Sequence, residues 1–387
     1  MLNKLRMLTP GPTPLPDRVR FAMARDMIHH REPSFVALFS QVQQRLGQLF
    51  GTAQPVIPLT ASGSGAMSAA VANLFREGEA VIVVVGGQFG ERWMEICKAQ
   101  GVKTYPISVE WGESVTVEAV AQALDAHPDA RGILVQVSET STGVMHPVKE
   151  LAALTAKRDV LLVADGVSSI SLSPCPMDEW GLDVLLTGSQ KGLLLPPGLS
   201  FIALSAKAWK KAESFPCRDY YFNLVSERDN NEKSQTHFTP AISLLYGLHE
   251  SLEMLFEDGL EAVYKKQWAL ANMARAGATA IGLEPFAKTS FAWGLTSVAL
   301  PAGINSGPLL AHMAERHGVV MASGMGKIKE RYIRIGHMGW VDWADLAAGL
   351  YALSSSFIAL GGHSGSRNYL ETALAAYESA LTDPLPM

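Results

Sequence analysis

The chain has 387 residues, of which 48% are hydrophobic and 18% charged, and its formal net charge is −5. This length exceeds the size at which single hydrophobic cores usually stop growing, so we expect two domains. The slightly acidic balance argues against binding to nucleic acid or to an anionic membrane surface, and no apolar run reaches the ~18 residues of a membrane-spanning helix.

The N-terminal segment predicts an extended arm followed by a helix. Prolines punctuate TPGPTPLP at residues 9–16, which favours extended backbone. The segment lacks the long apolar core of a secretory signal, so we expect a cytoplasmic protein. Ser34 stands where a helix N-cap would, and apolar residues follow it at helical spacing: Phe35, Leu38, Val42, Leu46 and Leu49.

From about residue 55 to 205 the sequence alternates between apolar runs and helical stretches. We interpret the apolar runs as buried strands, at 81–85, 102–107, 132–137, 160–165, 183–188 and 200–205. Strands that are apolar throughout and separated by helices predict a parallel sheet covered on both faces. In such a sheet, ligands bind at the carboxyl ends of the strands.

After about residue 240 the character changes. A helical region over roughly 241–280 contains few helix breakers. Short strands are expected at GLTSVAL, GVVMA and YIRIG, with helices near 306–317 and 341–358. This pattern indicates a smaller α+β domain.

A Gly/Ser-rich loop precedes the first strand of the alternation. SGSGAMSAA, residues 62–70, leads from this loop into an Ala-rich helix. Exposed N–H groups in the loop and the dipole of the helix favour an anion such as a phosphate. No lysine follows the glycines, so the segment is not a P-loop. An ordinary structural loop is the alternative.

Polar or aromatic residues follow the next strands at their carboxyl ends. Phe89, in GGQFGERW, could stack on a planar heterocycle or belong to the core. The hydroxyls of SETSTGV could donate hydrogen bonds to a ligand or form a polar turn. Asp165 ends a very apolar strand, so its carboxylate needs a partner, either a protonated ring nitrogen or nearby hydroxyls.

Lys191 lies in GSQKGLLLPPG, between a polar turn and a run of leucines. A buried ammonium is costly to desolvate, and the cost falls if the amine is neutral or becomes an imine. With the phosphate loop, the aromatic residue and Asp165, this lysine completes the four contacts of a pyridoxal phosphate (PLP) site. In this interpretation Lys191 forms the Schiff base, Asp165 keeps the ring nitrogen protonated, and Gln190 adds a donor to the phosphate.

The chain resembles the class V, fold-type I PLP-dependent aminotransferases, in particular the alanine–glyoxylate and serine–pyruvate group. The resemblance covers nearly the whole chain and rests on TPGPTPLP, HHREPSF, SGSGAMSAA, SETSTGV, ADGVSS, GSQKGLLLPPG, THFTPAISLLYGLHESL and YIRIG. It implies an N-terminal arm over 1–15 and a large PLP-binding domain with a mainly parallel seven-stranded sheet over 16–255. A smaller C-terminal α+β domain over 256–387 and a homodimer with shared active sites are also implied.

The resemblance implies a role for individual residues. Lys191 matches the Schiff-base lysine, Asp165 the acid on the ring nitrogen, and Arg334 the arginine that binds the substrate carboxylate. Phe89 matches the stacking aromatic residue, often tryptophan in relatives, and Thr140 a hydroxyl near the ring. Implied phosphate contacts are Ser64, Gly65, Ala66 and Gln190, with Thr236 and Thr239 from the neighbouring subunit. Ala66 and Thr236 stand where some relatives have histidine and tyrosine.

Several histidines have no implied catalytic role. His29 and His30 precede Arg31 in a motif of the family, which we interpret as a helix end or subunit contact. His337 lies close to Arg334 in the sequence, and we interpret it as structural.

The implied reaction transfers an amino group between alanine or serine and glyoxylate or pyruvate, with ping-pong kinetics. A second substrate charge would need another cation, for which Arg18, Arg31 and Lys327 are candidates, so aspartate and aminoethylphosphonate stay open.

Two alternatives to transamination remain: another PLP-dependent reaction on the same fold, and a non-catalytic role. A PLP-dependent lyase shares the fold, whereas a desulfurase needs a late catalytic cysteine and none follows Cys217. The cysteines at 97, 175 and 217 form no CxxC pair, which argues against a zinc site or a disulfide framework. A non-catalytic subunit of a larger assembly is the third possibility.

Overall fold

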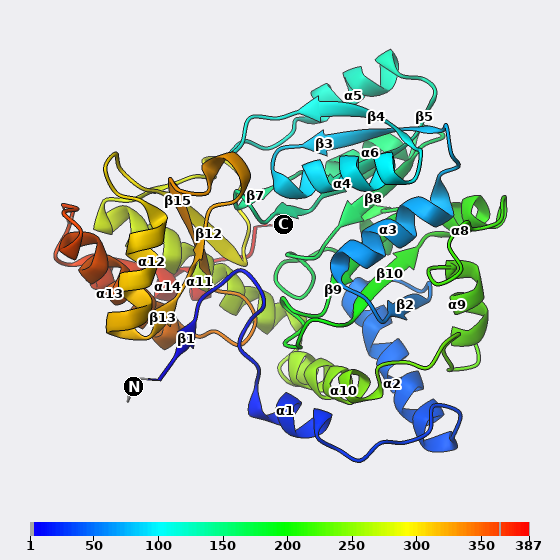
Figure 1. Ribbon diagram of the computed structural model, residues 1–387, viewed down its shortest axis with the longest axis horizontal. Helices are drawn as coiled ribbons and strands as arrows, with labels where there is room; N and C mark the ends of the chain where they lie inside the picture. Colours follow the sequence, from blue (N-terminus) through cyan, green and yellow to red (C-terminus); the bar gives the residue numbers. More distant parts are fainter. Residues whose placement is uncertain (1–3, 364, 387) are drawn as a thin grey trace.

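A seven-stranded sheet organises the first two thirds of the chain in the computed structural model, which describes residues 4–363 and 365–386 (Figure 1). Its strands in spatial order are β2 (Val56–Leu59), β10 (Ser200–Leu204), β9 (Val184–Gly188), β8 (Leu161–Asp165), β5 (Ala130–Gln136), β3 (Ala80–Val85) and β4 (Lys103–Ser108). Only β10 runs antiparallel to its neighbours. The mainly parallel sheet and all six expected strands are confirmed, and β2 is an additional strand.

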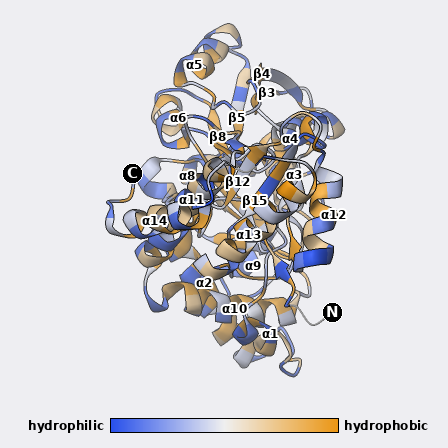
Figure 2. Cartoon of the chain, turned by 90° about the vertical axis from the view of Figure 1, so that its left-hand side faces the viewer, coloured by the Kyte–Doolittle hydropathy of each residue, from blue (hydrophilic) through white to orange (hydrophobic). Residues whose placement is uncertain are grey.

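Helices cover both faces of this sheet, as the apolar strands require. One face packs under α3 (Gly63–Leu74), α4 (Gln88–Ala99) and α8 (Ala206–Glu213), and its core includes Leu134, Val163 and Leu186. The opposite face packs against α2 (Pro33–Phe50), α5 (Val117–Ala126), α6 (Val148–Thr155) and α10 (Ile242–Glu257). Many helices carry hydrophobic and hydrophilic residues on different sides (Figure 2).

Two helix boundaries differ from the expectation. Pro33, not Ser34, opens α2, and Glu32 occupies the N-cap position. Proline suits the first position of a helix because its missing N–H would have no acceptor there. The region 241–280 is two helices, because α10 ends before Asp258 and α11 (Leu260–Ile281) begins after Gly259, whose φ is +82°. Glycine adopts this left-handed conformation without steric cost.

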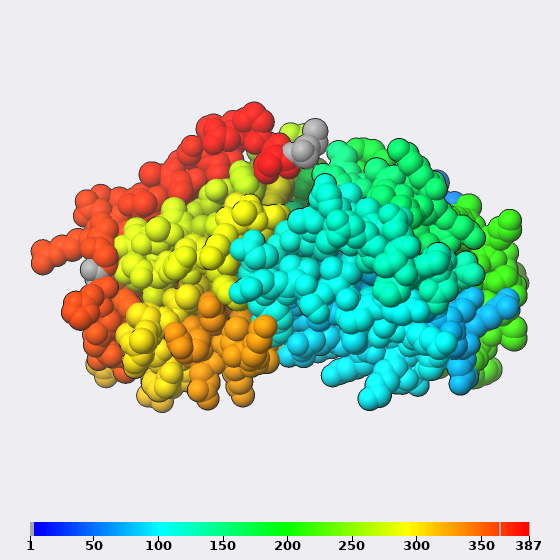
Figure 3. Space-filling model, turned by 90° about the horizontal axis from the view of Figure 1, so that it is seen from above, coloured from blue at the N-terminus to red at the C-terminus, as the bar shows by residue number. Residues whose placement is uncertain are grey.

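The C-terminal part has a separate sheet and core. Its antiparallel strands in spatial order are β11 (Glu284–Pro285), β12 (Leu295–Ala299), β15 (Tyr332–Gly336) and β14 (Ala322–Ser323). Helices α11, α12 (Ser306–His317), α13 (Trp343–Ala359) and α14 (Tyr369–Thr382) contribute to its core, which also includes Leu8 of the arm. Helix α14 was not expected from the sequence. Figure 3 shows the two parts side by side, and we keep their division near residue 256 as a proposal.

The remaining elements are short. They are β1 (Arg6–Met7), α1 (Asp17–Met23), β6 (Ser138–Glu139), β7 (Val144–Met145), α7 (Met177–Trp180), α9 (Leu224–Asn231), β13 (Val319–Val320) and a 3₁₀ turn at Gly326–Ile328. Within the described residues, every helix is too short or too polar to span a bilayer.

The N-terminal arm connects the small sheet to the large one. Strand β1 pairs in parallel with β13, and Gly336 N–H donates to the carbonyl of Leu8 at 2.7 Å. Farther along, the hydroxyl of Thr13 donates to the carbonyl of Lys191 at 3.2 Å. Any side chain at position 336 would collide with the carbonyl group of Thr9, so the close passage of the arm over β15 requires glycine there.

We predict that Gly336→Ala displaces the arm from β15. The added methyl group overpacks this contact, so the free energy of unfolding should fall by about 1–3 kcal/mol, and trypsin should cleave after Arg6 faster than in the parent protein. Gly307→Ala is the matched control, because a Cβ at this exposed helix position meets no atom. It should be neutral or stabilise by about 0.4–1 kcal/mol. Unchanged arm protection in Gly336→Ala would contradict this account.

Candidate active site

The candidate site lies at the carboxyl edge of the large sheet, beneath α3 and α4. Asp165 ends β8 and lies beside Gln136, which ends β5. Both side chains continue the face that carries Leu134 and Val163, the face covered by α3 and α4. Lys191 follows the end of β9 by three residues. The topology therefore places these groups where ligands bind in parallel α/β sheets.

The amine of Lys191 is buried, with the residue only 7% exposed. Its Nζ donates a hydrogen bond to the carbonyl of Pro10 in the arm. Burial, with a smaller contribution from the charges of Arg334 and Arg92, lowers the pKa of Lys191 to about 7, and the charge of Asp165 opposes this change. A large fraction of the amine is therefore neutral and nucleophilic at neutral pH.

Gly11 allows the arm to pass directly over Lys191. Its φ is +104°, a conformation that residues with a side chain rarely adopt. A Cβ there would lie 2.6 Å from Cδ and Cε of Lys191. The lysine side chain is thus enclosed by the arm as well as by the large sheet.

The carboxylate of Asp165 is buried, and no cation among the described residues forms an ion pair with it. Burial raises its pKa to about 6, whereas a hydrogen bond from Val167 N–H, at 2.9 Å, and the charges of Lys191 and Arg92 act in the opposite direction. Neither Asp165 nor Arg92 forms an ion pair among the residues that the structure describes. A buried charge of this kind is costly unless a cation approaches it.

Two amide side chains in the same region lack partners. Both amide atoms of Gln136 and Oε1 of Gln190 are buried and form no hydrogen bond within the described residues. Gln190 was expected at the site, whereas sequence reasoning missed Gln136. Its signal was a polar residue at the end of an otherwise apolar run. Unpaired buried polar groups of this kind indicate a place for a polar ligand or water.

Glu139 is a fully buried carboxylate that sequence reasoning also missed. It accepts hydrogen bonds from the N–H groups of Phe89 at 3.1 Å and Gly90 at 3.2 Å, and from N–H and Oγ of Ser141 at 3.0 and 2.6 Å. Burial raises the pKa of Glu139, and these hydrogen bonds oppose the rise. A carboxylate at the N-terminus of α4 is favourable, so Glu139 fixes the start of this helix and the position of Phe89.

Arg334 reaches the site from the small sheet. Its Nε donates to the carbonyl of Ser323 at 2.8 Å, and its Nη1 lies 3.3 Å from the carbonyl of Thr140, whose hydroxyl is 2.6 Å from that of Ser168. Burial lowers the pKa of Arg334 to about 10, and the charge of Glu139 opposes this. The guanidinium therefore stays protonated at neutral pH and can bind a carboxylate.

The Gly/Ser loop forms the first turn of α3, and its geometry differs from the expectation. The N–H groups of Gly65 and Ala66 donate to the carbonyl of Ser62, at 2.7 and 3.3 Å, so they are not free donors. Those of Gly63 and Ser64, at the first two helical positions, have no intrahelical acceptor. The hydroxyl of Ser64 accepts a hydrogen bond from Nη1 of Arg92 at 3.1 Å.

Thr236 and Thr239 lie in the loop before α10. The hydroxyl of Thr236 donates to the carbonyl of Phe238 at 2.6 Å. Both threonines line a small pocket beside Tyr221. No hydrogen bond among the described residues connects either threonine to Lys191 or Ser64 within the chain.

The His29–Arg31 motif and His337 lie in different parts of the fold. Arg31 donates to the side chain of Gln235, which places the His29–Arg31 motif against the loop of Thr236. His337 is fully buried with a pKa lowered to about 3 by burial, and its ring nitrogens contact Gln267 and Thr296.

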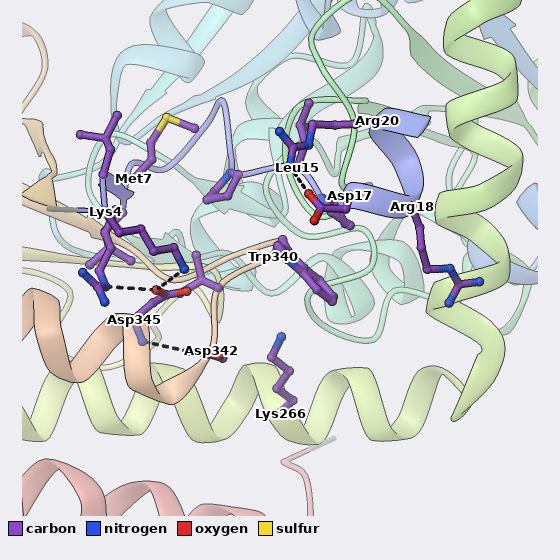
Figure 4. Close-up of a pocket in the computed structure, with 16 residues that line it drawn as sticks. Lys4, Met7, Leu15, Asp17, Arg18, Arg20, Lys266, Trp340, Asp342 and Asp345 are labelled. Atoms are coloured by element: carbon purple, nitrogen blue, oxygen red, sulfur yellow. Dashed lines mark hydrogen bonds and ion pairs between the residues drawn. The ribbon is translucent and has the colours of Figure 1, made fainter. Parts of the chain in front are cut away.

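A separate cavity of about 560 Å³ lies among the arm, α1, α11 and the start of α13 (Figure 4). Its lining includes Trp340, Lys266, Asp342 and Asp345, but neither Lys191 nor any other residue of the site at the sheet edge. The candidate catalytic and binding residues therefore lie at the carboxyl edge of the large sheet and not in this cavity.

The chain is similar to known proteins over most of its length. The family model described as Aminotransferase class-V matches residues 19–328. The soluble hydrogenase small subunit of Synechococcus sp. (strain PCC 6716) is 34% identical, over 93% of this chain and 95% of that protein. The serine–glyoxylate aminotransferase of Methylorubrum extorquens is 33% identical, over 91% of this chain and 90% of that protein.

Among solved structures, pyridoxamine–pyruvate aminotransferase from Mesorhizobium loti superposes with a TM-score of 0.93 at 27% identity, covering 97% of this chain and 98% of that one. The sequence match extends across both parts of the chain, and the structural match extends across both sheets. The chain therefore belongs to the class-V aminotransferase family and has the fold-type I architecture of its enzymes.

Proposed function

We propose that the protein is a PLP-dependent aminotransferase that moves an amino group between a small amino acid, serine or alanine, and a 2-oxo acid such as glyoxylate or pyruvate. The observation that carries this proposal is the buried amine of Lys191, which is close enough to Asp165 and Arg334 for their charges to shift its pKa. Membership of the family and the relative named serine–glyoxylate aminotransferase support the reaction class.

The residues present fit the cofactor. A protonated pyridine nitrogen would neutralise Asp165, which has no ion-pair partner in the described chain. The unpaired amides of Gln136 and Gln190 offer hydrogen bonds to its polar groups. The half-buried ring of Phe89 is held in place through Glu139 and offers a face for stacking.

When bound, PLP supplies an aldehyde that can attach covalently to a lysine and a ring that withdraws electrons from the substrate Cα. The chain supplies the groups that bind the substrate and move the proton. The neutral amine of Lys191 would take the proton from the substrate Cα and deliver it to the former aldehyde carbon of the cofactor. Arg334 holds the substrate carboxylate through paired N–H donors. Asp165 keeps a proton on the ring nitrogen, and the arm above Lys191 excludes water.

The preference for a small monocarboxylic substrate follows from the cations available. Arg18 is already paired with Glu250 and Glu257, and Arg31 with Gln235. Lys327 lies 4.8 Å from the ring centre of Trp111 and forms no ion pair among the described residues. It is the candidate that would favour a second acidic group, so aspartate is the runner-up substrate.

We propose further that the enzyme is a homodimer in which Thr236 and Thr239 contact the phosphate of the partner subunit's site. The support is that no hydrogen bond among the described residues joins these threonines to Lys191 or Ser64 of their own chain, and that they lie in a loop held by Arg31 and Gln43. The two sites of such a dimer would depend on each other for completion.

The competing functions receive less support. Burial raises the pKa of the thiols of Cys97 and Cys175 to about 12, and that of Cys217 is also raised, so none supplies the reactive thiolate of a desulfurase. A non-catalytic subunit is favoured by the names of relatives described as hydrogenase subunits, such as that of Synechococcus. A PLP-dependent β-lyase would remove the same Cα proton but then expel the group on Cβ, so the identity of the product distinguishes it from an aminotransferase.

A single-substrate experiment tests the proposed function. The PLP-loaded enzyme mixed with serine or alanine alone should lose its visible absorption and release one equivalent of the corresponding 2-oxo acid, and glyoxylate or pyruvate should restore the absorption. Lys191→Ala should reduce turnover by at least ~10³-fold, because the group that carries the proton is lost. Lys210→Ala, an exposed lysine on α8, should behave like the parent protein.

Three results would contradict the proposal. Ammonia release together with pyruvate would indicate a lyase, and an enzyme without visible absorption in the presence of PLP would favour a non-catalytic subunit. Intersecting instead of parallel initial-rate lines would exclude the ping-pong scheme.

The lowered pKa of Lys191 predicts how cofactor attachment depends on pH. Only the neutral amine attacks an aldehyde, and the amine loses its proton as pH rises through its pKa of about 7. The rate at which the cofactor-free protein captures PLP should therefore rise with pH and reach half its maximum near pH 7, as stopped-flow absorbance can follow. A midpoint near the ordinary lysine value of ~10.4 would show that the amine is exposed to water.

A further inference from the structure

Arg92 is a cation in the candidate site that sequence reasoning did not identify. Its Nη1 donates to Oγ of Ser64 at 3.1 Å, and its guanidinium carbon lies 4.6 Å from the ring centre of Phe89. Ser64 belongs to the first turn of α3, whereas Arg92 and Phe89 belong to α4. Arg92 therefore connects the expected phosphate loop to the expected stacking residue.

The N-terminus of α3 lacks the groups that usually satisfy a helix start. The side chain of Ser62 forms no capping hydrogen bond, and the first turn contains no acidic residue. The N–H groups of Gly63 and Ser64 have no intrahelical acceptor, so this end of the helix carries a partial positive charge of about half a unit.

A guanidinium beside such a helix end is electrostatically unfavourable unless an anion lies between them. Arg92 forms no ion pair in the part of the chain that the structure describes, so no carboxylate of the protein supplies that anion. Its charge is close enough to Lys191 and Asp165 to lower the pKa of both. The unneutralised charge thus lies within the site and not at its outer surface.

We infer that Arg92 binds the phosphate group of the cofactor, together with Ser64 and the N-terminus of α3. This inference rests on the proposed function. The backbone donors of Gly65 and Ala66 are occupied, and Ala66 has no side-chain donor, so the guanidinium supplies hydrogen bonds that the loop itself lacks. An arginine is suited to this role because its planar fork bonds two phosphate oxygens at once.

The test compares two ligands that differ only in the phosphate. The full-length protein, freed of cofactor, is titrated with PLP and with pyridoxal in equilibrium dialysis. Arg92→Ala should raise the Kd for PLP roughly ten- to hundredfold, as expected for lost hydrogen bonds to a charged group, and should change the Kd for pyridoxal little. Inorganic phosphate should compete with PLP in the parent protein and much less in the variant.

Two further variants separate charge, geometry and folding. Arg92→Lys keeps the charge without the fork and should fall between the parent and Arg92→Ala. Lys98→Ala, at the exposed end of the same helix, should leave both Kd values unchanged. Circular dichroism verifies that each variant is folded, and Arg92→Gln replaces Arg92→Ala if the latter is not.

Each alternative outcome identifies a different failure. An equal loss of affinity for both ligands would overturn the inference, because it would indicate that Arg92 acts by holding the ring of Phe89 in place. Unchanged affinity for PLP would also overturn it. A parent protein that binds neither ligand would overturn the proposed function, and the inference with it.

Discussion

The structure of the site depends on one constraint. The amine of Lys191 is buried between two parts of the chain, each of which has its own sheet and core. Lys191 follows the end of a central strand, but the groups around it come from the arm, from β8 and from the small sheet. Because water is excluded, the charges of Asp165, Arg334 and Arg92 act strongly on its protonation. The same exclusion gives an amine that is reactive near neutral pH.

The charged groups of the site differ in whether the described chain itself binds them. Within the described residues, Asp165 and Arg92 have no ion-pair partners, while Glu139 is used by backbone donors at the start of α4. A cofactor with a cationic ring nitrogen and an anionic phosphate would complement this arrangement if, as we propose, one end meets Asp165 and the other meets Arg92 and α3. The protein without its cofactor thus stores unsatisfied electrostatic energy that binding would release.

The sequence was sufficient for the features that depend on local patterns. The buried strands were visible as runs of β-branched and aliphatic residues, and Lys191 and Asp165 stood out because each is a charge inside an apolar run. Strand β2 was not predicted, because it has only four residues and includes Pro58. The break between α10 and α11 depends on a single Asp-Gly pair, which was too weak a signal inside a long helical pattern.

The missed residues of the site share a different cause. Glu139 acts on a helix that begins about fifty residues earlier, and Arg92 contacts a serine 28 residues away. Nothing in the local sequence marks them, because surface arginines and turn glutamates are common. Only the topology, which brings α3, α4 and the loop after β5 to one edge, gives them a role. The occupied donors of Gly65 and Ala66 likewise depend on the first turn of α3 and not on residue type.

The most direct measurement of the central claim is chemical trapping of the cofactor. Borohydride reduction of the PLP-loaded protein fixes an attached pyridoxyl group, and peptide mass spectrometry then locates it. The account predicts one modified site, Lys191, in nearly every molecule. Modification of other lysines at comparable yield, or a Lys191 peptide without added mass, would contradict it.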